Sequence, residues 1–116
     1  MAQVDITDRT FAFSLRIVKL CRILDASPGT NRTLANQLLR SGTSIGANVE
    51  EAQAAQSKPD FISKISIACK EARETLYWLR ILMASDIMPS SKLDPLKSEA
   101  NELVAILTTI IKNSRA

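Results

Sequence analysis

The amino-acid sequence predicts an all-α protein, an antiparallel up-down-up-down four-helix bundle that forms a single domain over residues 1–116. Three observations support this prediction. A chain of 116 residues has room for one hydrophobic core. Glycine and proline interrupt the chain clearly at 27–30, 57–60 and 88–91. Between these breaks, apolar residues recur with the period of a helix, and the short turns favour antiparallel neighbours.

The first helix is predicted over residues 7–25 and is apolar over more than half of its circumference. Phe11, Leu15 and Val18 share one face when each residue turns the helix by about 100°. The apolar surface extends beyond that face to Phe13, Ile17, Leu20, Cys21 and Leu24. We expect such a helix to pack against one neighbour inside the monomer and another outside it.

The remaining sector of the first helix carries a basic stripe, formed by Arg9, Arg16, Lys19 and Arg22. One interpretation is that the stripe contacts the phosphates of RNA or DNA and becomes a continuous electropositive surface in a ring of subunits. The other is that it is an ordinary solvated helix face. The net charge of +3 is compatible with both interpretations.

The second helix is predicted to begin with Thr30 or Asn31 as its N-cap and to end near Gln56. Gly42 and Gly46 lie in its interior, where each costs about 1 kcal/mol relative to alanine. Two such glycines predict a kink or a close helix approach. The core stripe of this helix comprises Leu34, Leu38, Ile45, Val49 and Ala52.

The opposite face of the second helix is polar and follows helical spacing, with Gln37, Arg40, Ser44, Asn48 and Glu51. A binding groove built from Arg40, Asn48 and Glu51 is one interpretation. We favour the other, a buried polar network that fixes helix register or the pairing of subunits.

The third helix is predicted to start at a capping box formed by Ser57 and Asp60, with Pro59 in its first turn. Its core stripe comprises Phe61, Ile65, Ala68, Ala72, Leu76, Leu79 and Met83, with Cys69 at the edge. A second apolar patch, set around Glu71 and Glu74, predicts a subunit interface. This patch contains Ile67, Trp78, Ile81 and Leu82.

The fourth helix is predicted to begin near Ser91, three residues before Asp94. Its core stripe comprises Leu96, Ala100, Leu103, Leu107, Ile110 and Ile111. The apolar segment 103–111 is shorter than the roughly 20 residues of a membrane-spanning helix. We therefore expect a cytoplasmic, reduced protein without a membrane partner.

The composition argues against an enzyme and against a metal or cofactor site. The absence of histidine removes the usual general base and the Glu-x-x-His ligands of a di-iron bundle. Three glycines form no phosphate-binding loop, and no small-molecule substrate is indicated. The Glu pairs 71/74 and 99/102 lie beside Lys70, Arg73 and Lys97, which predicts ordinary ion pairs. Cys21 and Cys69 lie on apolar faces, which predicts structural burial.

Residues 36–52, NQLLRSGTSIGANVEEA, resemble the pattern QLRRAA-SIPSNIAEG of a bacterial family of small four-helix bundle proteins associated with intervening sequences of 23S rRNA genes. Residues 57–64 and 71–79 are similar to the third helix of that family. Arg40, Ser44, Ile45, Asn48 and Glu51 fall on its motif positions, whereas Gly46 replaces a proline and Ala52 a glycine.

The resemblance implies an antiparallel bundle that assembles as a homopentamer. The family is also similar to the accessory variability determinant of diversity-generating retroelements, a basic pentamer that binds nucleic acid and a reverse transcriptase. We therefore expect a non-enzymatic, oligomeric bundle that binds RNA or DNA as an accessory or scaffolding protein, with a reverse transcriptase as a further partner. The alternative is a purely structural or protein-binding module without a nucleic-acid role.

Overall fold

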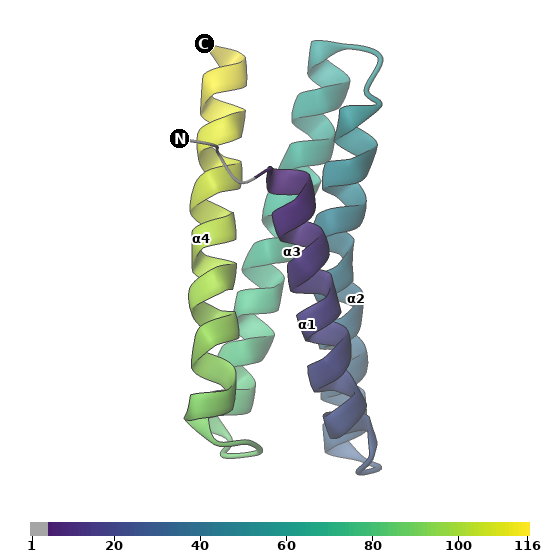
Figure 1. The fold of residues 1–116 in the computed structure, drawn as a ribbon, viewed down its shortest axis with the longest axis vertical. Coiled ribbons are helices and arrows are strands. Elements are labelled where there is room, and N and C mark those ends of the chain that lie inside the picture. The colour runs from purple at the N-terminus through teal and green to yellow at the C-terminus, as the bar shows by residue number, and fades with distance from the viewer. Residues whose placement is uncertain (1–4) are drawn as a thin grey trace.

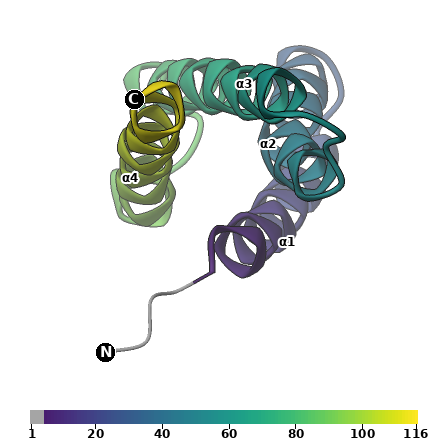
Figure 2. The same cartoon turned by 90° about the horizontal axis from the view of Figure 1, so that it is seen from above.

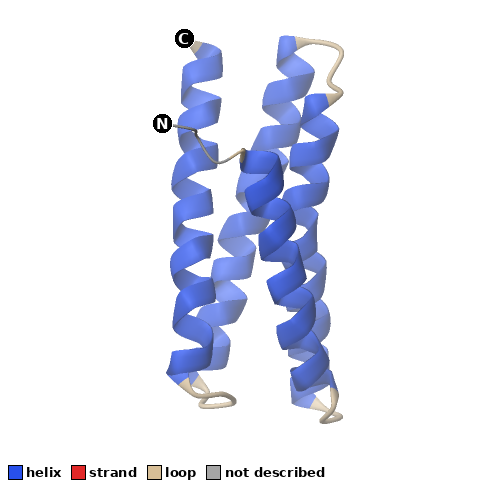
Figure 3. Cartoon of the chain, in the orientation of Figure 1, coloured by secondary structure: helices blue, strands red, loops and turns tan. Residues whose placement is uncertain are grey.

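The described residues, 5–116 of the computed structural model, form four helices and no strand (Figure 3). They are α1 (Ile6–Asp25), α2 (Thr30–Gln53), α3 (Lys58–Ala84) and α4 (Ser90–Arg115). The helices run alternately up and down along a body of 44 × 28 × 20 Å (Figure 1). The predicted all-α bundle is thus confirmed, while the first four residues of the predicted domain lie outside the described part.

Two helix starts follow the capping rules directly. The Asp5 carboxylate accepts a hydrogen bond of 2.9 Å from the Thr7 N–H and caps α1. Ser57 Oγ accepts one of 3.1 Å from the Asp60 N–H and caps α3, as predicted, with Pro59 in the first turn. These side chains satisfy backbone donors that have no partner inside the helix.

The ends of α2 differ from the prediction. Gly29, at φ 89°, is the N-cap, so neither Thr30 nor Asn31 takes that role. A left-handed conformation favours glycine, and it lets the chain turn directly into the helix after Pro28. The helix ends at Gln53 rather than near Gln56, because the chain must reverse before Ser57, whose backbone is extended (φ −154°, ψ 162°).

The core contains most of the side chains that the helical patterns selected. Phe13, Ile17, Leu38, Ile45 and Val49 are 0–1% exposed. The prediction was wrong for Leu82, which the sequence pattern assigned to the second apolar patch of α3 but which is completely buried. It continues a stripe that includes Thr75 and Leu79 at helical spacing, so it faces the core.

The two glycines of α2 permit a close approach to α1, while α2 continues as one helix through both positions. A Cβ atom on Gly42 would lie 2.8 Å from Ile17 Cγ2. A Cβ atom on Gly46 would lie 3.3 Å from both Ser14 Oγ and the Thr10 carbonyl oxygen. Of the two predicted alternatives, a kink or a close helix approach, the structure therefore shows the close approach.

The bundle is less closely packed between its first and last helices. Each helix packs extensively on the next one in sequence, whereas α1 meets α4 at far fewer positions. Seen from above, the four helices form an incomplete ring that opens between α1 and α4 (Figure 2). Within the described residues, no helix is both long and apolar enough to span a membrane.

Candidate nucleic-acid interface

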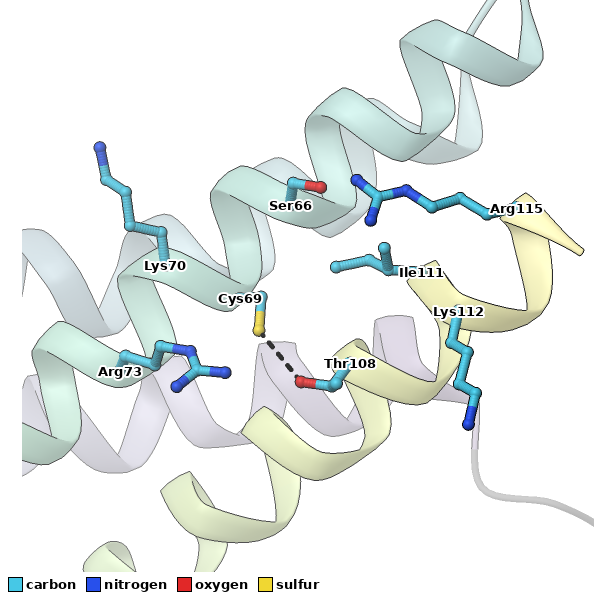
Figure 4. Close-up of a pocket in the computed structure, with 8 residues that line it drawn as sticks. All are labelled: Ser66, Cys69, Lys70, Arg73, Thr108, Ile111, Lys112 and Arg115. Carbon is cyan, nitrogen blue, oxygen red and sulfur yellow. Dashed lines mark hydrogen bonds between the residues drawn. The ribbon is translucent and has the colours of Figure 1, made fainter.

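A groove of about 600 Å³ lies on the surface between α3 and α4, and we call it the α3–α4 groove (Figure 4). Both helices contribute to it because they run side by side, so the first half of α3 faces the last two turns of α4. The lining residues are Ser66, Cys69, Lys70 and Arg73 from α3, and Thr108, Ile111, Lys112 and Arg115 from α4.

The charge of the α3–α4 groove is entirely positive among its described lining residues. Lys70 and Arg73 are exposed on one rim, and Lys112 and Arg115 are exposed on the other. Within residues 5–116 none of the four forms an ion pair. Four basic residues thus line one site in a chain whose net charge is only +3. Because like charges repel, such a cluster favours an anionic ligand.

The floor of the groove is neutral. Cys69 is 6% exposed, and its Sγ lies 3.5 Å from Thr108 Oγ1. The Thr108 hydroxyl donates to the Val104 carbonyl oxygen at 2.7 Å. The Arg115 guanidinium reaches toward Ser66, whereas the Lys70 and Lys112 ammonium groups project outward from the rims (Figure 4). In this arrangement the guanidinium groups can donate to phosphate oxygens, and the ammonium groups on the rims add positive charge around them.

Arg9, the first residue of the predicted basic stripe, is already paired within the chain. Its guanidinium donates to Glu99 at 2.7 and 2.8 Å and to Glu102 at 3.0 Å. The hydrogen bond with Arg9 holds the pKa of Glu99 below its usual value, and the same bond raises the pKa of Arg9. The pair joins α1 to α4, so Arg9 serves the fold in this structure.

The other members of the basic stripe border two different grooves. Arg16 and Lys19 line a groove between α1 and α4. Arg22 lines a different groove, between α1 and α2, together with Asp25. The structure therefore divides these three residues between two grooves.

The predicted interface residues Arg40, Glu71, Glu74 and Trp78 come together inside one chain. The Arg40 guanidinium donates to Glu71 Oε2 at 3.2 Å and is paired with Glu74. The Trp78 indole N–H donates to Glu74 Oε2 at 3.0 Å. Glu71 is 8% exposed, and the paired guanidinium compensates for the removal of its carboxylate from water. The network joins α2 to α3 through Arg40, which is itself exposed. The buried polar network on α2 stays a prediction.

The remaining predicted interface residues have more varied surroundings. Ser44 donates to the Arg40 carbonyl oxygen at 2.6 Å, and Asn48 donates to that of Ser44 at 2.8 Å, so both bond within α2. Glu51 is exposed. Ile67 is 37% exposed and Ile81 is partly buried.

The glutamate pairs each bind an arginine from another helix. Pair 71/74 holds Arg40 and pair 99/102 holds Arg9, so the predicted partners Lys70, Arg73 and Lys97 are not the ones observed. In the described part of the chain no group of three potential metal ligands occurs.

Both cysteines are buried and free, as predicted for structural residues. Burial raises the pKa of the Cys21 thiol to about 11, with a smaller contribution from Asp25. A thiol with that pKa is almost entirely protonated at neutral pH, so Cys21 is a poor nucleophile.

The sequence contained a signal for the α3–α4 groove that pattern analysis of single helices missed. Lys70 and Arg73 are three residues apart, and so are Lys112 and Arg115. Residues at this spacing share a helix face. The four positions become one site only when the two faces are known to meet, which requires the tertiary structure.

Comparison with known proteins identifies the family. Residues 2–109 match the 23S rRNA-intervening sequence protein family. A crystal structure of a protein of unknown function from the S23 ribosomal protein family of Bacteroides thetaiotaomicron superimposes with a TM-score of 0.87 and 39% sequence identity. The alignment covers 93% of this chain and 99% of that one. A search of curated proteins gives no match. The chain therefore belongs to the 23S rRNA-intervening sequence protein family.

Proposed function

We propose that this protein is a non-enzymatic nucleic-acid-binding accessory protein that holds the phosphate backbone in the α3–α4 groove. The observation that carries the proposal is the cluster of Lys70, Arg73, Lys112 and Arg115 around one groove, with no ion pair to these four within residues 5–116. Lysine and arginine side chains bind phosphates by charge and by hydrogen bonds. The association of the family with 23S rRNA intervening sequences makes RNA the first candidate ligand.

The lining of the groove also favours one kind of nucleic acid. Proteins that hold single strands stack the bases on aromatic side chains. No aromatic residue is among the described residues that line the α3–α4 groove. Contacts to phosphates alone do not read the base sequence. We therefore expect binding to structured RNA or to duplexes, with little sequence preference and a strong dependence on salt.

The first experiment measures fluorescence anisotropy of a structured RNA and a duplex DNA with the full chain. The variant Lys70→Gln/Arg115→Gln removes one cation from each rim and is expected to weaken binding by about tenfold or more. The matched control, Arg22→Gln/Arg80→Gln, removes two exposed charges elsewhere and is expected to change affinity much less. An equal loss of affinity in both variants, or no binding of nucleic acid by the wild type at low salt, would refute the groove as the binding site.

Self-assembly is the second part of the proposal, and exposed apolar side chains support it. Phe11 and Leu15 on α1 are 59% and 50% exposed, and Leu39 on α2 is 38% exposed. On α3, Tyr77 and Ile67 are 51% and 37% exposed. Two different apolar surfaces on one chain suit a heterologous contact, which closes into a ring when the rotation permits. The homopentamer expected from the family resemblance is such a ring.

Light scattering of the purified chain tests this assembly. We expect an oligomer that the variant Phe11→Ser/Leu15→Ser converts to a smaller species while the circular dichroism of its helices is retained, because both side chains are largely exposed. Ala12→Ser, an exposed change on the same helix, is the control. A wild-type chain that stays monomeric at micromolar concentration would contradict the proposal.

The alternative, a structural or protein-binding module, has its own support in these same apolar surfaces, because exposed patches also mark sites for partner proteins. A reverse transcriptase partner stays a prediction from the family resemblance. Loss of all nucleic-acid binding at low salt, together with intact folding, would favour this alternative.

A further inference from the structure

A second groove, of about 350 Å³, lies between α1 and α4 at the end of the molecule where α1 finishes and α4 begins. We call it the α1–α4 groove. It shares no lining residue with the α3–α4 groove. The glutamates that hold Arg9 lie farther along α4, beside the start of α1. From that contact the two helices diverge toward the groove (Figure 1).

The interior of the α1–α4 groove is apolar. Leu20 and Leu96, from opposite sides, are 6% and 5% exposed and belong to the core. Ile23 is 60% exposed, and Met88 is partly buried against the core. An isoleucine that is largely exposed beside core side chains offers apolar area that a ligand can cover.

The rims of the α1–α4 groove are basic. Arg16 and Lys19 line it from α1, and Lys92 lines it from α4, all three exposed. No carboxylate is among the described residues that line it. A ligand that complements this groove has an apolar strip with negative charge on both sides. A nucleic-acid backbone supplies the charge but no apolar strip to cover Ile23.

From this combination we propose that the α1–α4 groove binds an acidic amphipathic helix of a partner protein. Such a helix places apolar residues at i, i+3, i+4 and i+7 on one face, and these fit a hydrophobic groove between two helices. Its flanking Asp or Glu side chains meet Lys19 on one rim and Lys92 on the other. Helices α1 and α4 are far less tightly packed on each other than the helix pairs that are consecutive in sequence. The partner helix would therefore extend the bundle where its packing is incomplete.

The probe is a fluorescein-labelled synthetic peptide with leucines at that helical spacing and glutamates on both flanks, titrated with the full chain. Saturable binding is expected, together with a gain of helical circular dichroism in the peptide. A scrambled peptide of equal composition, and one with lysines in place of the glutamates, are expected to bind at least about tenfold more weakly, because each lacks the apolar face or the charge match.

Matched variants locate the site. Lys19→Glu/Lys92→Glu reverses one charge on each rim, and Ile23→Asp removes the exposed apolar side chain. Each is expected to weaken peptide binding by about tenfold or more. Lys70→Glu/Lys112→Glu makes the same charge change in the α3–α4 groove and is expected to leave peptide binding nearly unchanged. Circular dichroism and the denaturation midpoint verify that each variant is folded.

Several outcomes would overturn the proposal. One is absence of saturable binding by the acidic peptide, and another is equal binding of the scrambled peptide. A third is an equal loss in the Lys70→Glu/Lys112→Glu control, because it would indicate general charge attraction. A fourth is dissociation of the assembled chain by Ile23→Asp in light scattering, because the occupant would then be a second copy of this chain.

Discussion

The side chains of Arg9 and Arg40 show why residue type alone did not identify which basic residues are free to bind a ligand. Each is held by two glutamates three residues apart on a neighbouring helix, Glu99 and Glu102 for Arg9, and Glu71 and Glu74 for Arg40. These partners lie 31 or more positions away along the chain. Their charges are balanced inside the monomer, so the cations of the α3–α4 groove are better placed to bind a ligand.

The Arg9–Glu99 contact predicts a pH-dependent contribution to stability. The pKa of Glu99 is lowered by folding, so the contact stabilises the fold at neutral pH and is lost as the pH falls below about 4.5 toward the folded-state pKa. Replacing one partner of a charged hydrogen bond costs about 1–3 kcal/mol. We expect Glu99→Gln to lower the free energy of unfolding by that amount at neutral pH and by less in acid, measured by urea denaturation.

The control for this prediction is Glu50→Gln, an exposed carboxylate on α2 that forms no ion pair within the described residues. It is expected to have little effect at either pH. If Glu99→Gln lowers the free energy of unfolding equally at neutral and acid pH, the result would contradict the assigned role of the contact.

The number and type of the elements could be predicted from the sequence, because the apolar period of each helix is long and the breaks between them are clear. The Ser57 cap was also predicted, since a cap depends on residues within one turn. The Gly29 cap was missed because it depends on a left-handed backbone rather than on a side-chain oxygen. The divergence of α1 from α4 and the meeting of two basic faces depend on contacts between distant residues, which the pattern of a single helix does not contain.

The close approach of α1 and α2 leads to a prediction about Gly42. Alanine is favoured over glycine inside a helix by about 1 kcal/mol. Here, however, an added Cβ would meet Ile17 at 2.8 Å, and Ile17 is completely buried and β-branched, so it has little room to move. We expect Gly42→Ala to destabilise the protein by about 1–3 kcal/mol in spite of its helix propensity.

Thermal or urea unfolding of Gly42→Ala measures this effect. Asn36→Ala, at an exposed position of the same helix, is the control and is expected to be neutral or slightly stabilising. A Gly42→Ala protein that is as stable as the wild type or more stable would show that the two helices can separate without cost.

At the scale of the whole molecule, the position of the charges matters more than their sum. The chain carries 15 basic and 12 acidic residues, yet the described lining of the α3–α4 groove contains four basic residues and no acidic one. Arg9 joins α1 to α4 and Arg40 joins α2 to α3, whereas the α3–α4 groove lies between a different pair of helices. In an assembled ring, each groove would be repeated once per subunit, which would multiply a modest net charge into several separate basic sites.

The slope of the logarithm of the RNA association constant against the logarithm of salt concentration tests the central claim most directly. Each phosphate contact contributes about −0.7 to −0.9 to that slope. The account predicts a clear negative slope for the wild-type chain, and a slope smaller in magnitude by about 1.4 to 1.8 per bound subunit for Lys70→Gln/Arg115→Gln, which lacks two of the contacts. The same slope in the wild type and in this variant, with a loss of slope in Arg22→Gln/Arg80→Gln instead, would contradict the account.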